Sequence, residues 1–175
     1  MENDIIKNFK DIIVKNVKCG KYKEEKDVKD LIKYITGHSI IEKHQKAVRY
    51  TGGYGVHACD PVLCYKDMYI IKKIYEKTTS KNRSIYHFVV SFPEYIEDAN
   101  TVKLISINIC HHFYEQGFQC MYGVHEDTEN LHIHIAVNST NFKTGKQMHL
   151  KYNELSDTIT GLKKLAYNVL KENGY

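Results

Sequence analysis

The sequence predicts a single α+β domain in which a central antiparallel β-sheet carries helices packed mainly on one of its faces. Three observations support this class. Segments with helical periodicity alternate with short segments rich in β-branched and aromatic residues. Two of the strand-like segments are separated by only a few turn residues, which favours an antiparallel hairpin. The 175 residues contain no internal repeat or linker, and this length suits one domain with a substantial core.

The N-terminal half is expected to be mostly helical. Residues 4–18 and 27–36 have the spacing of amphipathic helices, with Asp27 as the N-cap of the second one. Residues 51–61, TGGYGVHACDP, predict a loop rich in glycine. No Gly-Lys-Ser/Thr sequence follows, so this loop does not resemble a phosphate-binding P-loop. A further helix is expected over residues 65–78.

From residue 84 onward, strands and helices follow one another more regularly. The predicted strands are 84–92, 118–126 and 131–138, and the predicted helices are 98–117 and 153–172. Between the last strand and the last helix, the segment NFKTGKQMHL predicts a short hairpin that turns at Thr144 and Gly145.

Composition places the chain among ordinary globular proteins, with 42% hydrophobic and 26% charged residues. No apolar run approaches the ~20 residues of a membrane helix and the N-terminus lacks a signal-peptide pattern, so we expect a cytoplasmic protein without membrane insertion. Five cysteines without paired spacing argue against a disulfide framework. Residues 1–50 carry twelve Lys and Arg against eight Asp and Glu, and this local basic excess permits a polyanionic partner.

The segment GVHEDTENLHIHIAVNS, residues 123–139, holds three histidines within ten residues. A hairpin that turns at residues 127–130 would place His125 opposite His132 and Gly123 opposite His134. Cross-strand partners share a face of the sheet, as do residues two apart in one strand. The three imidazoles should therefore meet on one face over small residues, while the other face is apolar.

Three histidines on one patch have the spacing of a metal site. Opposed Cβ atoms lie roughly 5 Å apart, so the rings can converge on a cation at ~2.0–2.1 Å. Three neutral ligands leave coordination positions open, which is typical of catalytic rather than structural sites. Asp127 is a candidate for accepting a proton from a ligand's second nitrogen and thereby fixing its tautomer. His87, on the preceding predicted strand, is a weaker candidate for lining the same site.

A cation held by neutral ligands keeps its charge and is suited to polarising a phosphodiester. The chain has no Gly-x-Ser-x-Gly elbow, and none of its cysteines has an evident base partner. Tyrosine, with fourteen residues, is the abundant alternative nucleophile. A phenol beside a cation can form a phosphotyrosyl bond, which conserves the phosphodiester bond energy and makes cleavage reversible.

At this point the residues resemble a known family. HEDTENLHIHIAVN resembles the His-x-Asp…His-hydrophobe-His…Asn motif of conjugative relaxases, the MobA-like mobilisation nucleases of the HUH endonuclease superfamily. LIKYITG resembles the motif that carries their nucleophilic tyrosine, and YHFVVSF resembles the strand between the two motifs. The resemblance extends over roughly residues 27–150. It implies an HUH relaxase-like fold, a divalent metal held by His125, His132 and His134, and Tyr34 and Asp127 as catalytic residues.

The resemblance also implies a reaction. Such proteins nick one DNA strand at a transfer origin, stay attached to its 5′ end and later rejoin it. The expected cofactor is Mn²⁺ or Mg²⁺, with Zn²⁺ as an alternative. The expected partners are single-stranded origin DNA, accessory mobilisation proteins and a coupling protein, and a monomer is expected. Residues 1–175 would form one relaxase domain, the N-terminal part of a longer protein.

DNA contacts are expected from basic and polar residues near the tyrosine helix, in loops and in the late hairpin. The candidates are Lys33, Arg49, Lys81, Arg83, Lys143, Lys146 and Asn138. The family's second motif contains a serine near the nick, for which Ser80, Ser84 and Ser91 are equal candidates.

Three alternatives remain open. In rolling-circle replication initiators the tyrosine follows the histidines as Tyr-x-x-x-Lys, and this chain offers Tyr167 and Lys171 at that spacing. A three-histidine zinc hydrolase that acts on a small substrate through bound hydroxide would need no tyrosine. A binding module with a structural metal would need a fourth protein ligand.

Overall fold

The computed structural model describes residues 9–17, 22, 24–38, 48–78 and 83–175. The strands are β1 (Ile13–Asn16), β2 (Val48–Tyr54), β3 (Ile85–Ser91), β4 (Cys120–His125) and β5 (His132–Asn138). The helices are α2 (Glu25–Ile35), α4 (Pro61–Ile74), α5 (Ala99–Glu115) and α6 (Tyr152–Glu172). The second half of the chain agrees with the predicted order of elements.

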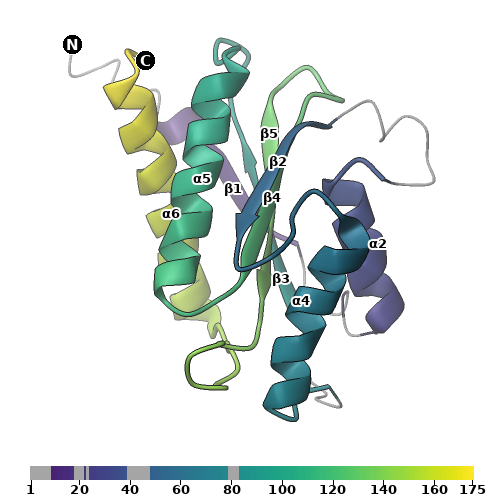
Figure 1. The fold of residues 1–175 in the computed structure, drawn as a ribbon. Coiled ribbons are helices and arrows are strands. Elements are labelled where there is room, and N and C mark those ends of the chain that lie inside the picture. Colours follow the sequence, from purple (N-terminus) through teal and green to yellow (C-terminus); the bar gives the residue numbers. More distant parts are fainter. Residues whose placement is uncertain (1–8, 18–21, 23, 39–47, 79–82) are drawn as a thin grey trace.

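One five-stranded sheet forms the centre of the molecule, in the order β1-β3-β5-β4-β2. Every pair of neighbouring strands is antiparallel, so the predicted α+β class is confirmed. The expectation that helices lie mainly on one face is wrong, because α5 and α6 cover one face and α2 and α4 cover the other (Figure 1). The reason is that β4 and β5 consist entirely of buried residues, so both faces of the sheet's centre require cover.

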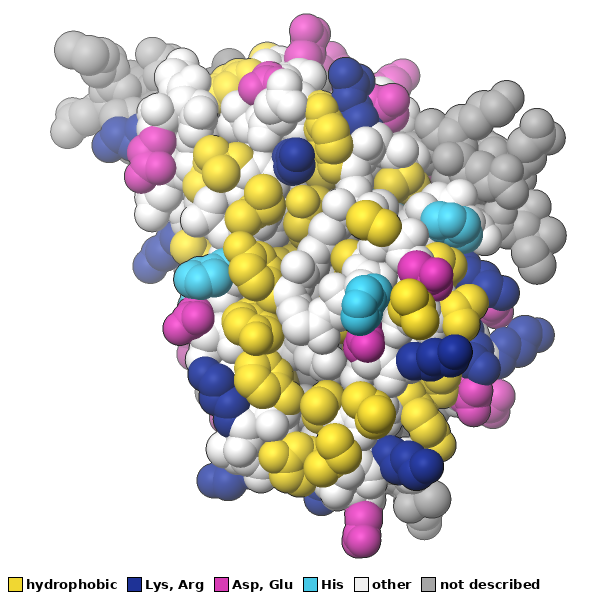
Figure 2. All heavy atoms as spheres, in the orientation of Figure 1, with side chains coloured by type: hydrophobic (Ala, Val, Ile, Leu, Met, Phe, Trp, Pro, Cys, Tyr) yellow, Lys and Arg dark blue, Asp and Glu magenta, His cyan; other side chains and the backbone are white. Residues whose placement is uncertain are grey.

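The two faces differ in what they pack. The face under α5 and α6 carries the larger apolar core, which includes Phe88, Tyr122 and Ile135. The face under α2 and α4 has a smaller apolar cluster around Met121 and Ala136, and the rest of that face is available to polar side chains. Apolar side chains are also exposed on the outer side of α4, where Figure 2 shows them beside basic side chains. Among the described residues, no helix is long and apolar enough to cross a membrane.

In the N-terminal half, one expected helix and part of one expected loop are wrong. Residues 4–18 were expected to be helical, but Ile13–Asn16 forms the edge strand β1 against β3, and only residues 9–11 of the described part are helical. Residues 51–54 were expected in a loop, but they belong to β2. Their glycines serve close approach, because a Cβ on Gly52 would lie 2.5 Å from the hydroxyl of Tyr122.

Helix boundaries follow local capping chemistry. The side chain of Asp60 accepts hydrogen bonds from two backbone N–H groups in the first turn of α4, and Asp98 does the same for α5. The expected N-cap at Asp27 is wrong, since α2 begins at Glu25 with Glu24 before it. The predicted hairpin after β5 is reduced to one bridge between Thr140 and Gln147, and its turn contains Gly145 at φ +68°.

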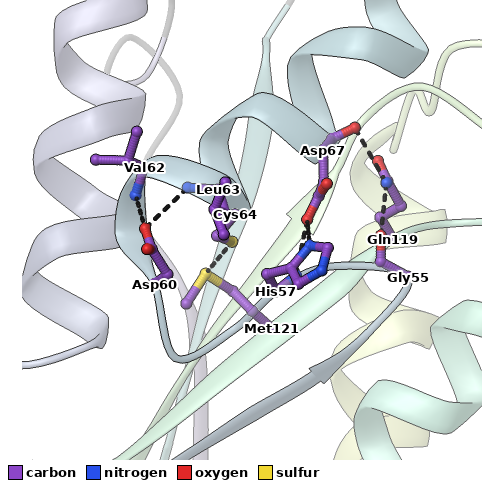
Figure 3. A network of polar contacts seen from close by, with 9 residues as sticks. All are labelled: Gly55, His57, Asp60, Val62, Leu63, Cys64, Asp67, Gln119 and Met121. Carbon is purple, nitrogen blue, oxygen red and sulfur yellow. Dashed lines mark hydrogen bonds and ion pairs between the residues drawn. The ribbon is translucent and has the colours of Figure 1, made fainter.

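The loop after β2 is anchored by a polar network that is seen in Figure 3. The carboxylate of Asp67 accepts a hydrogen bond from the backbone N–H of His57 at 2.7 Å and lies 2.8 Å from that residue's Nδ1. The amide of Gln119 donates to the carbonyl of Gly55 at 2.8 Å and to that of Asp67 at 3.2 Å. These contacts tie α4 to the start of β4, so the helix keeps its place on the face that carries the histidines.

Candidate metal centre and nucleophile

The hairpin of β4 and β5 has the register that the sequence predicts. His125 lies opposite His132, and Gly123 lies opposite His134. The alternate residues of both strands, among them Tyr122 and Ile135, belong to the apolar core under α5 and α6. The histidines therefore project from the other face, toward α2. The whole hairpin is buried, which removes the imidazoles from bulk water.

The three histidines form a cluster suited to a metal ion. One ring nitrogen from each of His125, His132 and His134 lies within 4.8 Å of the other two, and the side chains are 0%, 8% and 8% exposed. Ligand nitrogens at ~2.0–2.1 Å from a common tetrahedral ion lie roughly 3.4 Å apart, so small ring rotations bring the cluster to metal-binding distances. The residues fit a metal in donor type, number and separation.

The hydrogen bonds of His132 assign its tautomer. Its Nδ1 lies 3.0 Å from the backbone carbonyl of Asn130, which can only accept, so Nδ1 donates to it and Nε2 is the nitrogen left to ligate a cation. Asp127 was expected to accept the proton from a ligand's second nitrogen, but the carbonyl of Asn130 fills that role. The Asp127 carboxylate instead lies 3.2 Å from Nε2 of His132, on the side where a cation would bind.

Tyr34, near the end of α2, points into the histidine cluster. Its hydroxyl lies 3.2 Å from Nε2 of His134, and its ring centroid is 5.0 Å from that of His125. Burial, with a smaller effect from the negative charge of Asp127, raises the pKa of Tyr34 to about 12. The phenol is therefore protonated at neutral pH, and a nearby positive charge is needed to make it a good nucleophile.

A glycine lets α2 come this close to the sheet. A Cβ on Gly123 would lie 2.2 Å from the backbone carbonyl oxygen of Ile35, the last residue of α2. Nε2 of His125 lies 3.3 Å from the same carbonyl. The missing side chain at Gly123 thus leaves the space in which the end of the tyrosine helix packs against β4.

A second layer of polar residues continues from the cluster into β3. Nε2 of His87 lies 2.9 Å from Nδ1 of His134, and the hydroxyl of Tyr22 lies 3.0 Å from Nδ1 of His87. His87 is buried, and its weaker sequence assignment to the site is confirmed by its position. Tyr22 was missed, because neither its spacing nor its neighbours in the chain connect it to the histidine motif.

Some predicted DNA contacts lie near the cluster. Lys33 directly precedes Tyr34 in α2 and is half-buried. Arg49 is exposed on β2 and forms an ion pair at 3.0 Å with Glu126, the residue that follows His125. Lys81 lies outside the described residues. In β3, Ser91 pairs with His132 and is close to the site, whereas Ser84 precedes the strand at its other end.

The other predicted contacts lie at the opposite end of the sheet. Lys143 and Lys146 are exposed in the turn after β5, and the seven residues of that strand span roughly 20 Å. Arg83 is buried and bonds the side chain of Asn16 at 3.1 Å. Asn138 as a DNA contact is wrong, because it is 0% exposed and its amide bonds the carbonyl of Met68. A buried polar side chain at the end of a strand forms its hydrogen bonds within the protein.

Tyr167, the nucleophile of the replication-initiator alternative, lies on the other side of the sheet. It belongs to α6, packs against the larger core and makes an edge-on ring contact with Phe9 at 5.5 Å. Its hydroxyl is buried and has no hydrogen-bond partner among the described residues. The sheet separates this phenol from the three histidines.

Comparison with known proteins connects this site to a family. The family model described as "Relaxase: MobA/VirD2-like, nuclease domain" matches residues 34–170. Protein TraI of Escherichia coli is 29% identical over 169 residues, which cover 93% of this chain and 22% of TraI. A second TraI from that species is 34% identical over 100 residues, covering 55% of this chain and 13% of its own length. MobA of Acidithiobacillus ferrooxidans is 33% identical over 78 residues, covering 41% of this chain and 17% of MobA.

The fold has a relative among solved structures. A chain from "Molecular Basis of Vancomycin Resistance Transfer in Staphylococcus aureus" superimposes with a TM-score of 0.60 at 11% identity, covering 94% of both chains. The family match runs from the tyrosine of α2 through the histidine hairpin, and this defines the class of protein: a relaxase nuclease domain with a histidine triad of the HUH type. The chain belongs to the MobA/VirD2-like relaxases, an enzyme family of conjugation and mobilisation.

Proposed function

We propose that this domain nicks and rejoins one DNA strand at a specific site in a transfer origin, during mobilisation of a plasmid or conjugative element. Tyr34 is the nucleophile, and the product of nicking is a phosphotyrosyl bond to the 5′ end. One observation carries the proposal: the Tyr34 hydroxyl lies 3.2 Å from Nε2 of His134, within the cluster of three histidines. Residues 1–175 act in this proposal as one nuclease domain.

The reaction is a transesterification without loss of bond energy. The Tyr34 oxygen forms a bond to phosphorus, the bond from phosphorus to the 3′ oxygen breaks, and the released 3′ hydroxyl takes up a proton that balances the one lost by the phenol. Rejoining is the reverse reaction. A divalent ion at the triad supplies positive charge that favours the phenolate and polarises the phosphate. We propose Mn²⁺ or Mg²⁺, because their preference for oxygen ligands suits a phosphate substrate, with Zn²⁺ as the alternative.

The protein's own residues contribute position and charge. α2 holds the phenol against the cluster by packing its last turn on Gly123. The carbonyl of Asn130 keeps the ring of His132 in the tautomer that ligates through Nε2. Asp127 adds a negative charge on the cation side of that ring. The burial of all three histidines lowers the local dielectric, which strengthens each of these interactions.

Single-stranded DNA is the proposed substrate, because the phenol and the cation must reach one phosphate from different sides and a paired strand would obstruct them. Lys33 and Arg49 lie next to the site and are proposed phosphate contacts. Lys143 and Lys146 would contact DNA only on a path that runs the length of the sheet. We propose that the domain acts as a monomer in the cytoplasm, together with accessory mobilisation proteins and a coupling protein.

The test is covalent capture of DNA. The protein is incubated with Mn²⁺ or Mg²⁺ and a panel of labelled, hairpin-bearing single-stranded oligonucleotides drawn from the DNA upstream of its gene, and the products are run on a denaturing gel. We expect an adduct that EDTA prevents and that Tyr34→Phe abolishes. If Tyr34→Phe still forms the adduct and Tyr167→Phe does not, the replication-initiator alternative is correct instead. Metal-dependent hydrolysis without any adduct would point to the zinc-hydrolase alternative, in which bound hydroxide rather than a tyrosine is the nucleophile.

A further inference from the structure

We propose that His87 and Tyr22 are positioning residues that hold the metal ligand His134 in its ligating tautomer and orientation. The inference rests on the metal site of the proposed function and extends it to a second layer of residues. In this arrangement a neutral imidazole, rather than a carboxylate, supports the ligand. His87 reaches the metal only through His134, so its effect should appear first in metal affinity.

The register of the sheet explains how these rings meet. β3 pairs with β5 so that His87 lies opposite Ala136, while Val89 lies opposite His134. His87 and His134 are thus diagonal neighbours on one face, and the small side chain of Ala136 leaves room for the imidazole of His87. Their ring centroids are 5.1 Å apart with planes at 34°, and their facing nitrogens are 2.9 Å apart.

Counting protons gives one arrangement that is compatible with metal binding. A neutral histidine has one N–H, and a ligating nitrogen must present its lone pair. If His134 ligates through Nε2, its proton is on Nδ1 and is donated to Nε2 of His87. The proton of His87 is then on Nδ1 and is donated to the Tyr22 hydroxyl, 3.0 Å away. Both contacts of the chain are satisfied in this direction.

The opposite direction would block the ligand. If His87 donated from Nε2, then Nδ1 of His134 would accept, and the proton of His134 would lie on Nε2, where a metal must bind. An acceptor at the position of His87 therefore favours the ligating form. Tyr22 supports this form by accepting at the far end, and the burial of His87 keeps water from replacing either partner.

The experiment measures metal binding directly, on the intact chain and without DNA. Isothermal titration with Mn²⁺ and with Co²⁺ is compared for the wild type, His87→Leu, His87→Gln and Tyr22→Phe. His87→Leu removes the acceptor, and we expect roughly tenfold or greater loss of affinity. His87→Gln keeps an amide oxygen that can accept, so it should recover part of that loss. Tyr22→Phe should lose less metal affinity than His87→Leu, because Tyr22 contacts His87 and not the ligand His134.

Two further measurements separate positioning from folding. The Co²⁺ absorption spectrum and the NMR shifts of the His134 ring nitrogens report the ligand's geometry and tautomer, which a general loss of stability would not alter. His111→Gln, at an exposed position on α5 on the other side of the sheet, is the matched control and should bind metal like the wild type.

The outcomes distinguish this inference from the proposed function. If the wild type binds Mn²⁺ while His87→Leu and His87→Gln bind it within twofold of the wild type and with an unchanged tautomer, the positioning role is overturned and the relaxase proposal stands. If His87→Leu does not fold, His87→Gln and Tyr22→Phe decide the question. If the wild type binds neither Mn²⁺ nor Co²⁺, the metal site itself is wrong and this inference is overturned with it.

Discussion

Adding one methyl group at Gly123 should separate Tyr34, the proposed nucleophile, from the histidines. In Gly123→Ala the new Cβ would lie 2.2 Å from the carbonyl oxygen of Ile35, and real Cβ contacts essentially never fall below 3.0 Å. The end of α2 and strand β4 must therefore separate by at least 0.8 Å, the difference between these two distances. Tyr34 directly precedes Ile35, so a shift away from the sheet would lengthen its 3.2 Å contact with His134 beyond hydrogen-bonding distance.

This displacement sets the size of the expected effects on stability and on the rate of adduct formation. Overpacking of a well-packed site costs about 1–3 kcal/mol, so Gly123→Ala should unfold at a lower urea concentration than the wild type. A misplacement of about 1 Å at a reacting group costs on the order of a hundredfold in rate. We expect adduct formation, measured under single-turnover conditions with saturating metal, to slow by about that factor. The variant should still bind metal because all three histidines remain, although less tightly than the wild type, since the new Cβ would also lie 3.0 Å from Nε2 of His125.

Gly161→Ala is the matched control. Gly161 lies within α6, and a Cβ there would meet no atom within 4 Å. The same substitution should therefore stabilise the protein by roughly 0.5–1 kcal/mol through helix propensity and leave nicking unchanged. If Gly123→Ala forms the adduct at the wild-type rate and unfolds with the wild-type midpoint, Gly123 does not set the position of Tyr34.

Burial lowers the pKa of Lys72 to about 8 in the folded protein, whereas the pKa of a lysine in the unfolded chain is about 10.4. Between these pH values the unfolded chain binds one more proton, so the free energy of unfolding rises with pH. This rise should be about 3 kcal/mol larger in the wild type than in Lys72→Met. Urea unfolding at pH 7 and pH 10 tests this. The same change in unfolding free energy between these pH values in both proteins would contradict it. Asp127→Asn should weaken Mn²⁺ binding in calorimetry by about tenfold, since a negative charge near the cation is lost; unchanged affinity would remove Asp127 from the site. Tyr167→Phe should form the adduct at the wild-type rate and lose no stability, because the deleted hydroxyl makes no hydrogen bond among the described residues. Loss of the adduct in that variant would instead assign the nucleophile to α6.

The arrangement of residues that lie close in the chain was predictable where the alternation of a β-strand determines it. The alternation of His132 and His134, with His125 across a four-residue turn, has one consistent pairing in an antiparallel hairpin, and the structure adopts it. Asn138 continues the same alternation and was also expected to contact DNA. Its amide is instead used inside the protein, because its neighbours at the strand's end are the backbone of α4 and Gln119. Periodicity identifies a face but not what covers that face.

The first 60 residues were harder to predict for a related reason. The segment Ile13–Asn16 alternates weakly and lies next to a helical turn, so its pairing with β3 depends on a partner more than 70 residues away. The glycines of β2 have the composition of a loop, yet they are strand residues where a neighbouring strand and a tyrosine ring approach closely. Local propensity gives no information about such distant neighbours.

By itself, the sequence determined the histidine trio, its hairpin and the tyrosine motif, because each depends on spacing within one or two adjacent elements. Only the tertiary structure decided that helices cover both faces, that Gly123 admits the end of α2, and that His87 and Tyr22 stand behind His134. These arrangements bring together residues from β3, β5 and the segment before α2, which lie far apart in the chain. Their contacts are selected by the space and the unsatisfied polar groups that remain after the strands have paired.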